Sequence, residues 1–278
     1  MASFKRIPVI FCALAVVLII ISVSVGSCIV DTNKKAEADR QIAAAEQAKQ
    51  DAKNEAKTRH ENSINAILNL SSQGESEHHI DISNFYYQYP ELPSGCEAVA
   101  LTNQLKFYGY KPSKTEIADK YLPRDGENFR DAFVGDPYNE VDGVTILPPG
   151  LRTTANNYLL DQHSDYHAYD ISKKNFEDLF AYIEHGHPVQ IWVTMYMDVP
   201  GEITSTYGED NFYINEHSLL LTGFNKNNDT VDVCCSLAGN VTYGLEQTKQ
   251  VWNQIGKHAL VLVKDSEGEA WAGYDQNN

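Results

Sequence analysis

The order of the secondary-structure patterns along the chain constrains its fold most. Up to residue 187, apolar residues recur at helical spacing, and Phe176, Leu179, Phe180 and Ile183 share one face of such a segment. Beyond residue 187, short runs rich in β-branched and aliphatic residues replace them. We expect helices at 96–109, 113–122, 149–160, 172–186 and 245–256, and strands at 188–197, 217–225, 230–236 and 258–263. This order predicts an α+β fold with a mostly antiparallel sheet.

The N-terminus predicts a membrane anchor. Residues 7–30 carry no charge and follow Lys5 and Arg6. As a helix they would extend for about 36 Å, enough to cross a bilayer core. We expect an uncleaved, single-pass signal anchor in a bacterial cell membrane, with the body outside the cytoplasm. The alternative is a lipoprotein anchored at Cys28, because "VGSC" matches a bacterial lipoprotein cleavage box.

Composition changes divide the rest of the chain. The anchor takes residues 1–30, and residues 31–74 are rich in Ala, Glu, Lys and Gln, which predicts a helical stalk. The folded body is expected at 75–264, and residues 265–278 form an acidic tail. The net charge of -16 argues against a nucleic-acid partner.

The five cysteines exclude a disulfide scaffold. Three of them, Cys96, Cys234 and Cys235, lie in the body, which is an odd number. No pair has the spacing of a zinc site, and we expect neither a metal nor a cofactor. Cys234 and Cys235 are neighbours, so a strained vicinal disulfide between them is a further possibility.

Cys96 is the candidate nucleophile. Pro93 and Gly95 form a turn before it, and the predicted helix begins at the cysteine, where the free N–H groups favour a thiolate and predict a lowered thiol pKa. A thiolate needs a proton-handling partner, and His217 begins a predicted strand 121 residues later. Gln88 is placed to donate to an oxyanion, together with the Cys96 backbone N–H. Singly, such a cysteine is most often a buried apolar residue and such a histidine structural; their joint order supports catalysis.

The segments "QYPELPSGCEAVALTNQLKFYG", "IADKYLP", "VGDP", "HPVQIWVTM", "EHSLLLTGFN", "SLAGNVTY" and "WNQIGKHALVL" follow one another from residue 88 to 262. In this order they resemble the papain-like cysteine peptidases akin to the bacteriocin-processing peptidases, family thirty-nine. The resemblance covers residues 80–263. It implies a papain-like fold, in which a helical lobe with the nucleophile packs on an antiparallel sheet that carries the histidine. It also implies that Cys96 is the nucleophile, His217 the base and Gln88 the oxyanion-hole residue.

One position departs from the resemblance. Related chains carry an Asp that orients the histidine, and Cys235 stands at that position here. A thiol is a poor hydrogen-bond acceptor, so the imidazole would be held less firmly. Two functions therefore remain: a membrane-tethered extracytoplasmic cysteine peptidase acting on a peptide or protein substrate, and a weakly active or inactive papain-like module that binds peptides. The chain contains no GxxxxGK[ST] loop, so the substrates of transporter-fused peptidases are not implied.

Overall fold

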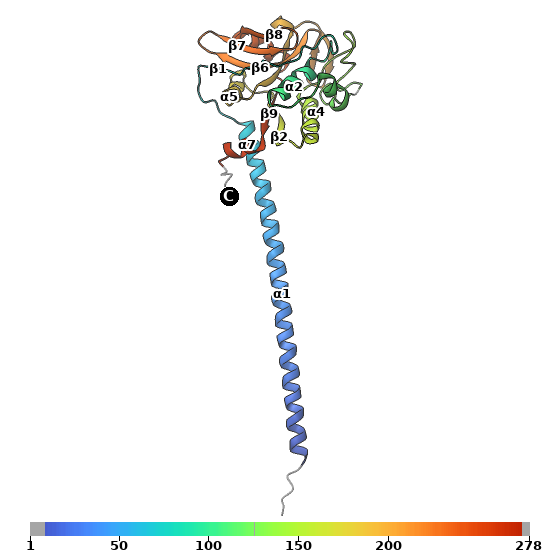
Figure 1. The fold of residues 1–278 in the computed structure, drawn as a ribbon, viewed down its shortest axis with the longest axis vertical. Coiled ribbons are helices and arrows are strands. Elements are labelled where there is room, and N and C mark those ends of the chain that lie inside the picture. The colour runs from blue at the N-terminus through green and yellow to red at the C-terminus, as the bar shows by residue number, and fades with distance from the viewer. Residues whose placement is uncertain (1–8, 125, 274–278) are drawn as a thin grey trace, which may run out of the picture. The chain divides into compact units, whose positions relative to one another are not determined.

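The computed structural model of the 278-residue chain describes residues 9–124 and 126–273. The chain separates into two units, residues 1–59 and 60–278. The described part of the first unit lies within helix α1 (Val9–Leu68), the blue helix of Figure 1. In the described residues, no helix combines the length and the apolar character that a membrane span requires. The first eight residues of the predicted anchor lie outside the described residues, and the anchor stays a prediction.

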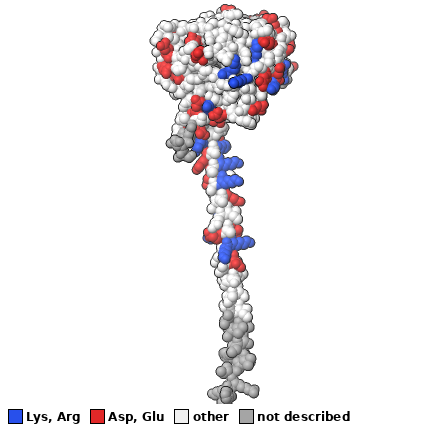
Figure 2. Space-filling view, in the orientation of Figure 1, with Lys and Arg blue, Asp and Glu red and all other residues white. Residues whose placement is uncertain are grey.

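The polar part of α1 follows from local propensity. Its Ala, Glu, Lys and Gln residues are strong helix formers, and each lies exposed along residues 31–59. Neighbouring turns are joined by side-chain pairs such as Gln47 Nε2 to Asp51 Oδ1 at 2.8 Å and Arg40 to Glu37 at 4.0 Å. Figure 2 shows both charge signs along this helix.

The second unit is built on one antiparallel sheet. Its strand order is β2-β9-β3-β6-β7-β8, and β1 also pairs with β6. The strands are β1 (Glu77–His79), β2 (Tyr166–Asp170), β3 (Val189–Thr194), β6 (Glu216–Asn225), β7 (Thr230–Cys235), β8 (Gly239–Gly244) and β9 (Ala259–Lys264). The long strand β6 lies near the middle, and all but the last of its ten residues are buried. Such a strand reads as one continuous apolar run, as "SLLLTGF" does.

Helices pack on this sheet. The described helices are α2 (Cys96–Phe107), α3 (Lys114–Glu116), which continues as the π-helical η1 (Ile117–Tyr121), α4 (Pro148–Asp161), the 3₁₀ turn η2 (Phe176–Leu179), α5 (Phe180–Glu184), the turn η3 (Met195–Met197), α6 (Leu245–Ile255) and α7 (Asp265–Trp271). Helix α2 packs against β6 and β3, and α6 packs against β3, β7 and β8. The predicted α+β architecture, with helices packed on an antiparallel sheet, is confirmed.

Helix α2 is buried over most of its circumference, because Glu97 to Leu105 are all buried. A helix that is enclosed on all sides must satisfy its polar groups internally. Gln104 Nε2 donates to Pro188 O at 2.7 Å, and Gln190 Nε2 of β3 donates to Glu97 O at 3.1 Å. These bonds join both ends of α2 to β3 and to the residue before it.

Some elements had no clear pattern in the sequence. Strands β1, β2 and β8 are short, and the hairpin of β4 (Ile203–Tyr207) and β5 (Asp210–Tyr213) stands apart from the main sheet. The start of the predicted acidic tail is helical, because Lys264 N is capped by Glu267 Oε2 at 3.1 Å. Gly268 of this helix lies against Ser63 and Ile67, with no room for a Cβ. Residues 60–68, which the sequence assigns to the stalk, therefore pack within the second unit.

Candidate active site

Cys96 is the first residue of α2, and its sulfur lies at the sheet. Ser218 N of β6 donates to Cys96 Sγ at 3.4 Å, and Sγ lies 3.3 Å from Glu97 Oε2. Because Ser218 directly follows His217, this contact brings the nucleophile and the histidine to one place. Cys96 is half-buried, and it opens into a cavity of about 230 Å³. The cavity is lined by residues that include Gln88, Cys96, Phe212, Glu216, His217 and Leu237.

His217 is buried, and one nitrogen of its ring contacts Cys235. Its Nε2 lies 3.3 Å from Cys235 Sγ at the end of β7, so the structure brings Cys235 to the imidazole. Cys235 Sγ also accepts from Leu237 N at 3.4 Å. Burial lowers the pKa of His217 to about 4 and raises the pKa of Cys235. The ring is therefore neutral near pH 7, and both Cys234 and Cys235 are free thiols.

Asp232 does not take the orienting role. It pairs with Gly223 of β6, well away from His217, and its carboxylate contacts His79 Nδ1 at 2.9 Å and accepts from Thr242 Oγ1 at 2.6 Å. The odd offset from Cys235 turns its side chain to the other face of the sheet, as the strand period requires.

Gln88 is fixed at the cavity by bonds to both flanks. Its Oε1 accepts from Ser236 Oγ at 2.7 Å, and its Nε2 donates to Pro93 O at 2.6 Å. The backbone of Gln88 is also hydrogen-bonded. Gln88 N donates to Ser236 O at 3.0 Å, and Lys114 Nζ donates to Gln88 O at 2.9 Å. An amide nitrogen has two hydrogens, so one remains for a ligand in the cavity. The Cys96 N–H has no partner within α2, because it is the first residue of the helix.

The expected low thiol pKa is wrong. Burial is the largest cause that raises the pKa of Cys96 well above its ordinary value, and the charge of Glu97 adds to it. The Ser218 N–H acts in the opposite direction. The helix N-terminus does not prevail, because burial and the adjacent carboxyl of Glu97 both disfavour the thiolate. The isolated thiol is therefore neutral at rest.

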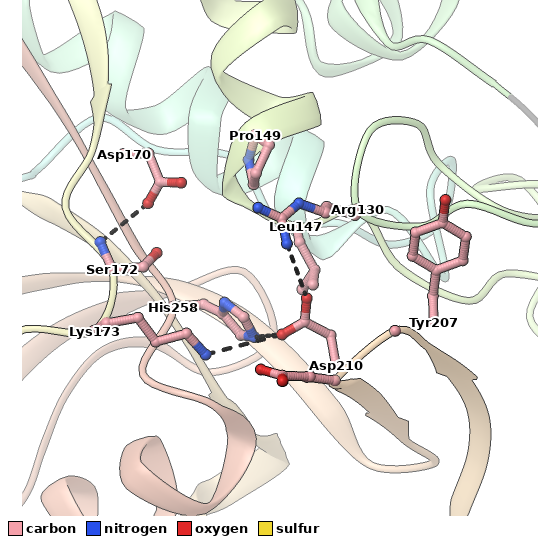
Figure 3. Close-up of a pocket in the computed structure, with 11 residues that line it drawn as sticks. Arg130, Leu147, Pro149, Asp170, Ser172, Lys173, Tyr207, Asp210 and His258 are labelled. Carbon is pink, nitrogen blue, oxygen red and sulfur yellow. Dashed lines mark hydrogen bonds and ion pairs between the residues drawn. The ribbon is translucent and has the colours of Figure 1, made fainter.

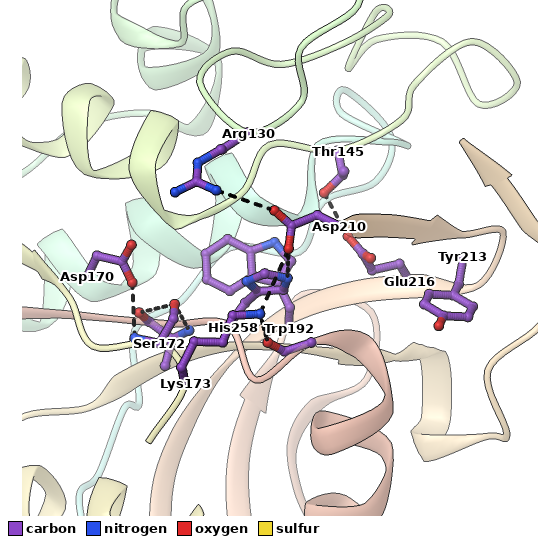
Figure 4. A network of polar contacts seen from close by, with 12 residues as sticks. Arg130, Thr145, Asp170, Ser172, Lys173, Trp192, Asp210, Tyr213, Glu216 and His258 are labelled. Atoms are coloured by element: carbon purple, nitrogen blue, oxygen red, sulfur yellow. Dashed lines mark hydrogen bonds and ion pairs between the residues drawn. The ribbon is translucent and has the colours of Figure 1, made fainter. Parts of the chain in front are cut away.

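Two buried glutamates at the candidate site were missed by sequence reasoning. Glu97 follows the cysteine and Glu216 precedes the histidine, so a carboxyl adjacent to each predicted site residue was the available signal. Thr145 joins them: its Oγ1 lies 2.6 Å from Glu97 Oε1 and 2.8 Å from Glu216 Oε1. Ile146 N also donates to Glu97 Oε1 at 3.2 Å. Figure 4 shows the contact between Thr145 and Glu216.

A second, larger cavity lies beside the β4–β5 hairpin. Its volume is about 500 Å³, and it surrounds Asp210, which Arg130 approaches to 3.8 Å, Lys173 to 3.9 Å and His258 to 3.6 Å (Figures 3 and 4). Among the described residues that line it there is no cysteine. In the described part of the chain, no group of three or more His, Cys, Asp or Glu side chains is placed to hold a metal ion. The smaller cavity at Cys96 is therefore the candidate active site.

Comparison with known proteins identifies the family of the chain. The model of the Peptidase_C39 like family matches residues 79–260. The uncharacterized protein YvpB of Bacillus subtilis is 26% identical over 193 residues, which cover 63% of this chain and 71% of YvpB. A crystal structure from Bacillus anthracis, described as a C39-like peptidase, superposes with a TM-score of 0.60 at 26% identity. That match covers 68% of this chain and 98% of the other.

The matched segment contains every element that carries the site, from the loop of Gln88 to the end of β7. The family match spans more than half of the chain, and the likeness to the Bacillus anthracis structure covers nearly all of that protein. The chain therefore belongs to the Peptidase_C39-like family, and its family and fold are those of a papain-like cysteine peptidase.

Proposed function

We propose that this protein hydrolyses peptide or related amide bonds through Cys96. In the reaction, the sulfur attacks the carbonyl carbon, and Gln88 and the Cys96 N–H donate to the oxyanion. The thiol proton is transferred to the leaving amine. His217, which lines the same cavity, takes part in this proton transfer. Water then hydrolyses the thioester and restores the thiol.

One observation carries the proposal: the sulfur of Cys96 accepts from Ser218 N at the start of β6, next to His217. This contact joins α2 to β6, and a nucleophile, a histidine and an amide donor line one cavity of about 230 Å³. Convergence of these three groups is the arrangement that acyl transfer requires.

The test is hydrolysis by the full chain of a mixture of fluorogenic peptide amides. Cys96→Ala should abolish turnover, and Cys234→Ala serves as the matched control, because Cys234 is a buried thiol outside the cavity lining. Equal turnover in wild type and Cys96→Ala would refute the proposal.

The alternative is a peptide-binding module with little or no catalysis. The contact of His217 Nε2 with a neutral thiol favours it, since Cys235 stabilises an imidazolium poorly. Binding of the same peptides, equal in wild type and Cys96→Ala and without hydrolysis, would establish this function.

The membrane location forms part of the proposal. The uncharged residues 7–30 after Lys5 and Arg6 support a single-pass anchor with the body outside the cytoplasm. Protease added to intact cells should digest the body, and a variant without residues 1–30 should stay in the soluble fraction. Labelling of the native protein by a fatty acid, lost in Cys28→Ala, would instead establish the lipoprotein form.

A further inference from the structure

The walls of the Cys96 cavity bear acidic side chains and no permanently cationic ones. Among the described residues that line it, Glu140 and Glu216 have carboxyl groups, and there is neither a lysine nor an arginine. The ring of His217 is neutral near pH 7, because burial lowers its pKa to about 4. The cavity therefore favours a positive group of a ligand over a negative one.

Glu140 provides an exposed carboxylate on the cavity wall. It lies in the loop between η1 and α4, and Tyr89 OH donates to its Oε1 at 2.9 Å. This bond ties the carboxylate to the residue that follows Gln88, at the side of the cavity where the oxyanion donor lies. A carboxylate accepts about four hydrogen bonds, so Glu140 still has acceptor positions for a ligand. In the described part of the chain, no basic side chain pairs with it.

Glu216 provides a second acceptor, which lacks a donor. This residue is 8% exposed and lines the cavity. Its Oε1 contacts Thr145 Oγ1 at 2.8 Å, whereas its Oε2 is buried without a hydrogen-bond partner in the described structure. A buried oxygen without a donor costs free energy, and an N–H group of a ligand in the cavity would remove that cost. Strand β6 and the loop of Glu140 thus each bring an acceptor to the same cavity.

A lysine close to the cavity does not cancel the charge of Glu140. Lys114 Nζ donates to Gln88 O at 2.9 Å and to Tyr89 O at 3.2 Å, and it forms an ion pair with Glu91. Its side chain is buried and does not line the cavity. Because Glu91 balances the charge of Lys114, the charge of Glu140 is left for a ligand.

Apolar side chains line the same cavity and favour a long organic cation. Met195, Phe212 and Ile214 belong to the lining, and Ile214 is 61% exposed. Lysine and arginine cover apolar surface with their methylene stems while the charged end reaches a polar partner. A metal ion would leave this apolar surface uncovered. A basic side chain of a peptide therefore fits the lining better than an inorganic cation does.

We propose that the cavity selects peptides with a Lys or Arg side chain beside the scissile bond, and that Glu140 determines this specificity. The inference rests on the proposed function, since it names the substrate class of the same site. The charged end of the side chain pairs with Glu140, its stem lies on apolar residues such as Ile214, and a peptide N–H satisfies Glu216 Oε2.

The test compares internally quenched peptides that differ only in Lys, Gln or Glu next to the scissile bond, placed once on each side of it. Both ends of each peptide are blocked, so the side chain is the only variable charge. For one of the two positions, kcat/KM of the full chain should fall about fivefold from Lys to Gln and again from Gln to Glu, as expected for an accessible ion pair. The differences should shrink at high salt, because screening weakens such a pair.

Variants assign the preference to Glu140. Glu140→Gln should bring the ratio of the Lys and Gln peptides close to one, and Glu140→Lys should make the Glu peptide the best substrate. Glu246→Gln removes the same charge at an exposed position of α6 outside the cavity lining, and it should keep the wild-type ratio. A preference that survives in Glu140→Gln, or equal rates for the three peptides in the wild type, would overturn the proposal.

A binding measurement separates the selection of basic peptides from catalysis. Fluorescently labelled forms of the same peptides are titrated with Cys96→Ala, and their dissociation constants should follow the order Lys, Gln, Glu. The additional change Glu140→Lys should reverse this order. The expected order of binding without hydrolysis by the wild type would refute the proposed function and support the selection. Hydrolysis without the expected order would do the opposite, and peptides that neither bind nor react would overturn both.

Discussion

Nε2 of His217 lies 3.3 Å from Sγ of Cys235, where related chains have a carboxylate. A carboxylate accepts from the ring and stabilises its charged form, whereas a thiol does neither well. Burial keeps the imidazole neutral near pH 7, and the carboxyl that contacts the sulfur is that of Glu97.

Replacing Cys235 by Asp should restore an acceptor for the imidazole. The pKa of His217 should rise, because an adjacent carboxylate favours the imidazolium, and turnover should increase about tenfold or more. The measurement is the NMR titration of the His217 ring, together with hydrolysis of fluorogenic peptide amides. Cys235→Ser is the control of similar size. An unchanged His217 titration in Cys235→Asp would contradict the orienting role of this position.

Gln88→Ala should slow hydrolysis without slowing thiol labelling. The loss of one oxyanion donor costs about 10²- to 10³-fold in kcat in a protease, and the iodoacetamide reaction has no oxyanion to stabilise. Because Gln88 also bonds Ser236 and Pro93, thermal unfolding must be measured alongside. Asp81→Asn, an exposed change in the same segment, is the control. Equal loss of labelling and turnover would indicate a structural role only.

Glu216→Gln should stabilise the protein more at pH 7.5 than at pH 4.5. The folded-state pKa of Glu216 is raised, so the native state holds a proton that the unfolded state loses above its ordinary pKa, and stability declines as the pH rises. Glutamine removes this pH-dependent cost. Besides Glu97 and Asp210, whose charges act on Glu216, Cys96 and His217 face the same network. Melting temperatures of both proteins at the two pH values provide the measurement, and an equal difference at both would contradict it.

Acid should destabilise the protein through His217 and His258. Burial lowers the pKa of each to about 4, so the unfolded state binds more protons than the native state below the ordinary value of 6.5. Stability should fall as the pH drops from 6.5 towards 4. His258→Gln should flatten this decline, whereas exchange of the exposed His79 should not. Parallel melting curves for wild type and His258→Gln across this range would contradict the expectation.

Gly268→Ala should lower stability by about 1–3 kcal/mol. A Cβ at this position would meet Ser63 and Ile67, which are packed against α7 within the second unit. Chemical denaturation of wild type and variant gives the difference. Gly273→Ala tests the same region at a position where a Cβ meets no neighbour, although its φ of 81° makes some strain unavoidable. Equal losses in the two variants would argue against the packing.

The sequence by itself determined the fold class and the elements that carry the site. The helix that begins at Cys96 and the strand predicted from His217, which the structure has as β6 from Glu216, both follow from periodicity and turn residues, which are local properties. Cys235 was placed beside the histidine through the family resemblance. Shorter strands such as β2 and β8 were not predicted, because a few residues with mixed burial show no clear hydrophobic periodicity.

Only the tertiary structure decided the protonation of the site. The helix N-terminus acts on Cys96 through local geometry, so a lowered thiol pKa was the natural prediction. Glu97 and Glu216 lie 119 positions apart, and they meet through Thr145 from a loop without periodicity. The energy of a buried charge depends on every neighbour that folding brings to it. No single segment of the sequence specifies that set of neighbours.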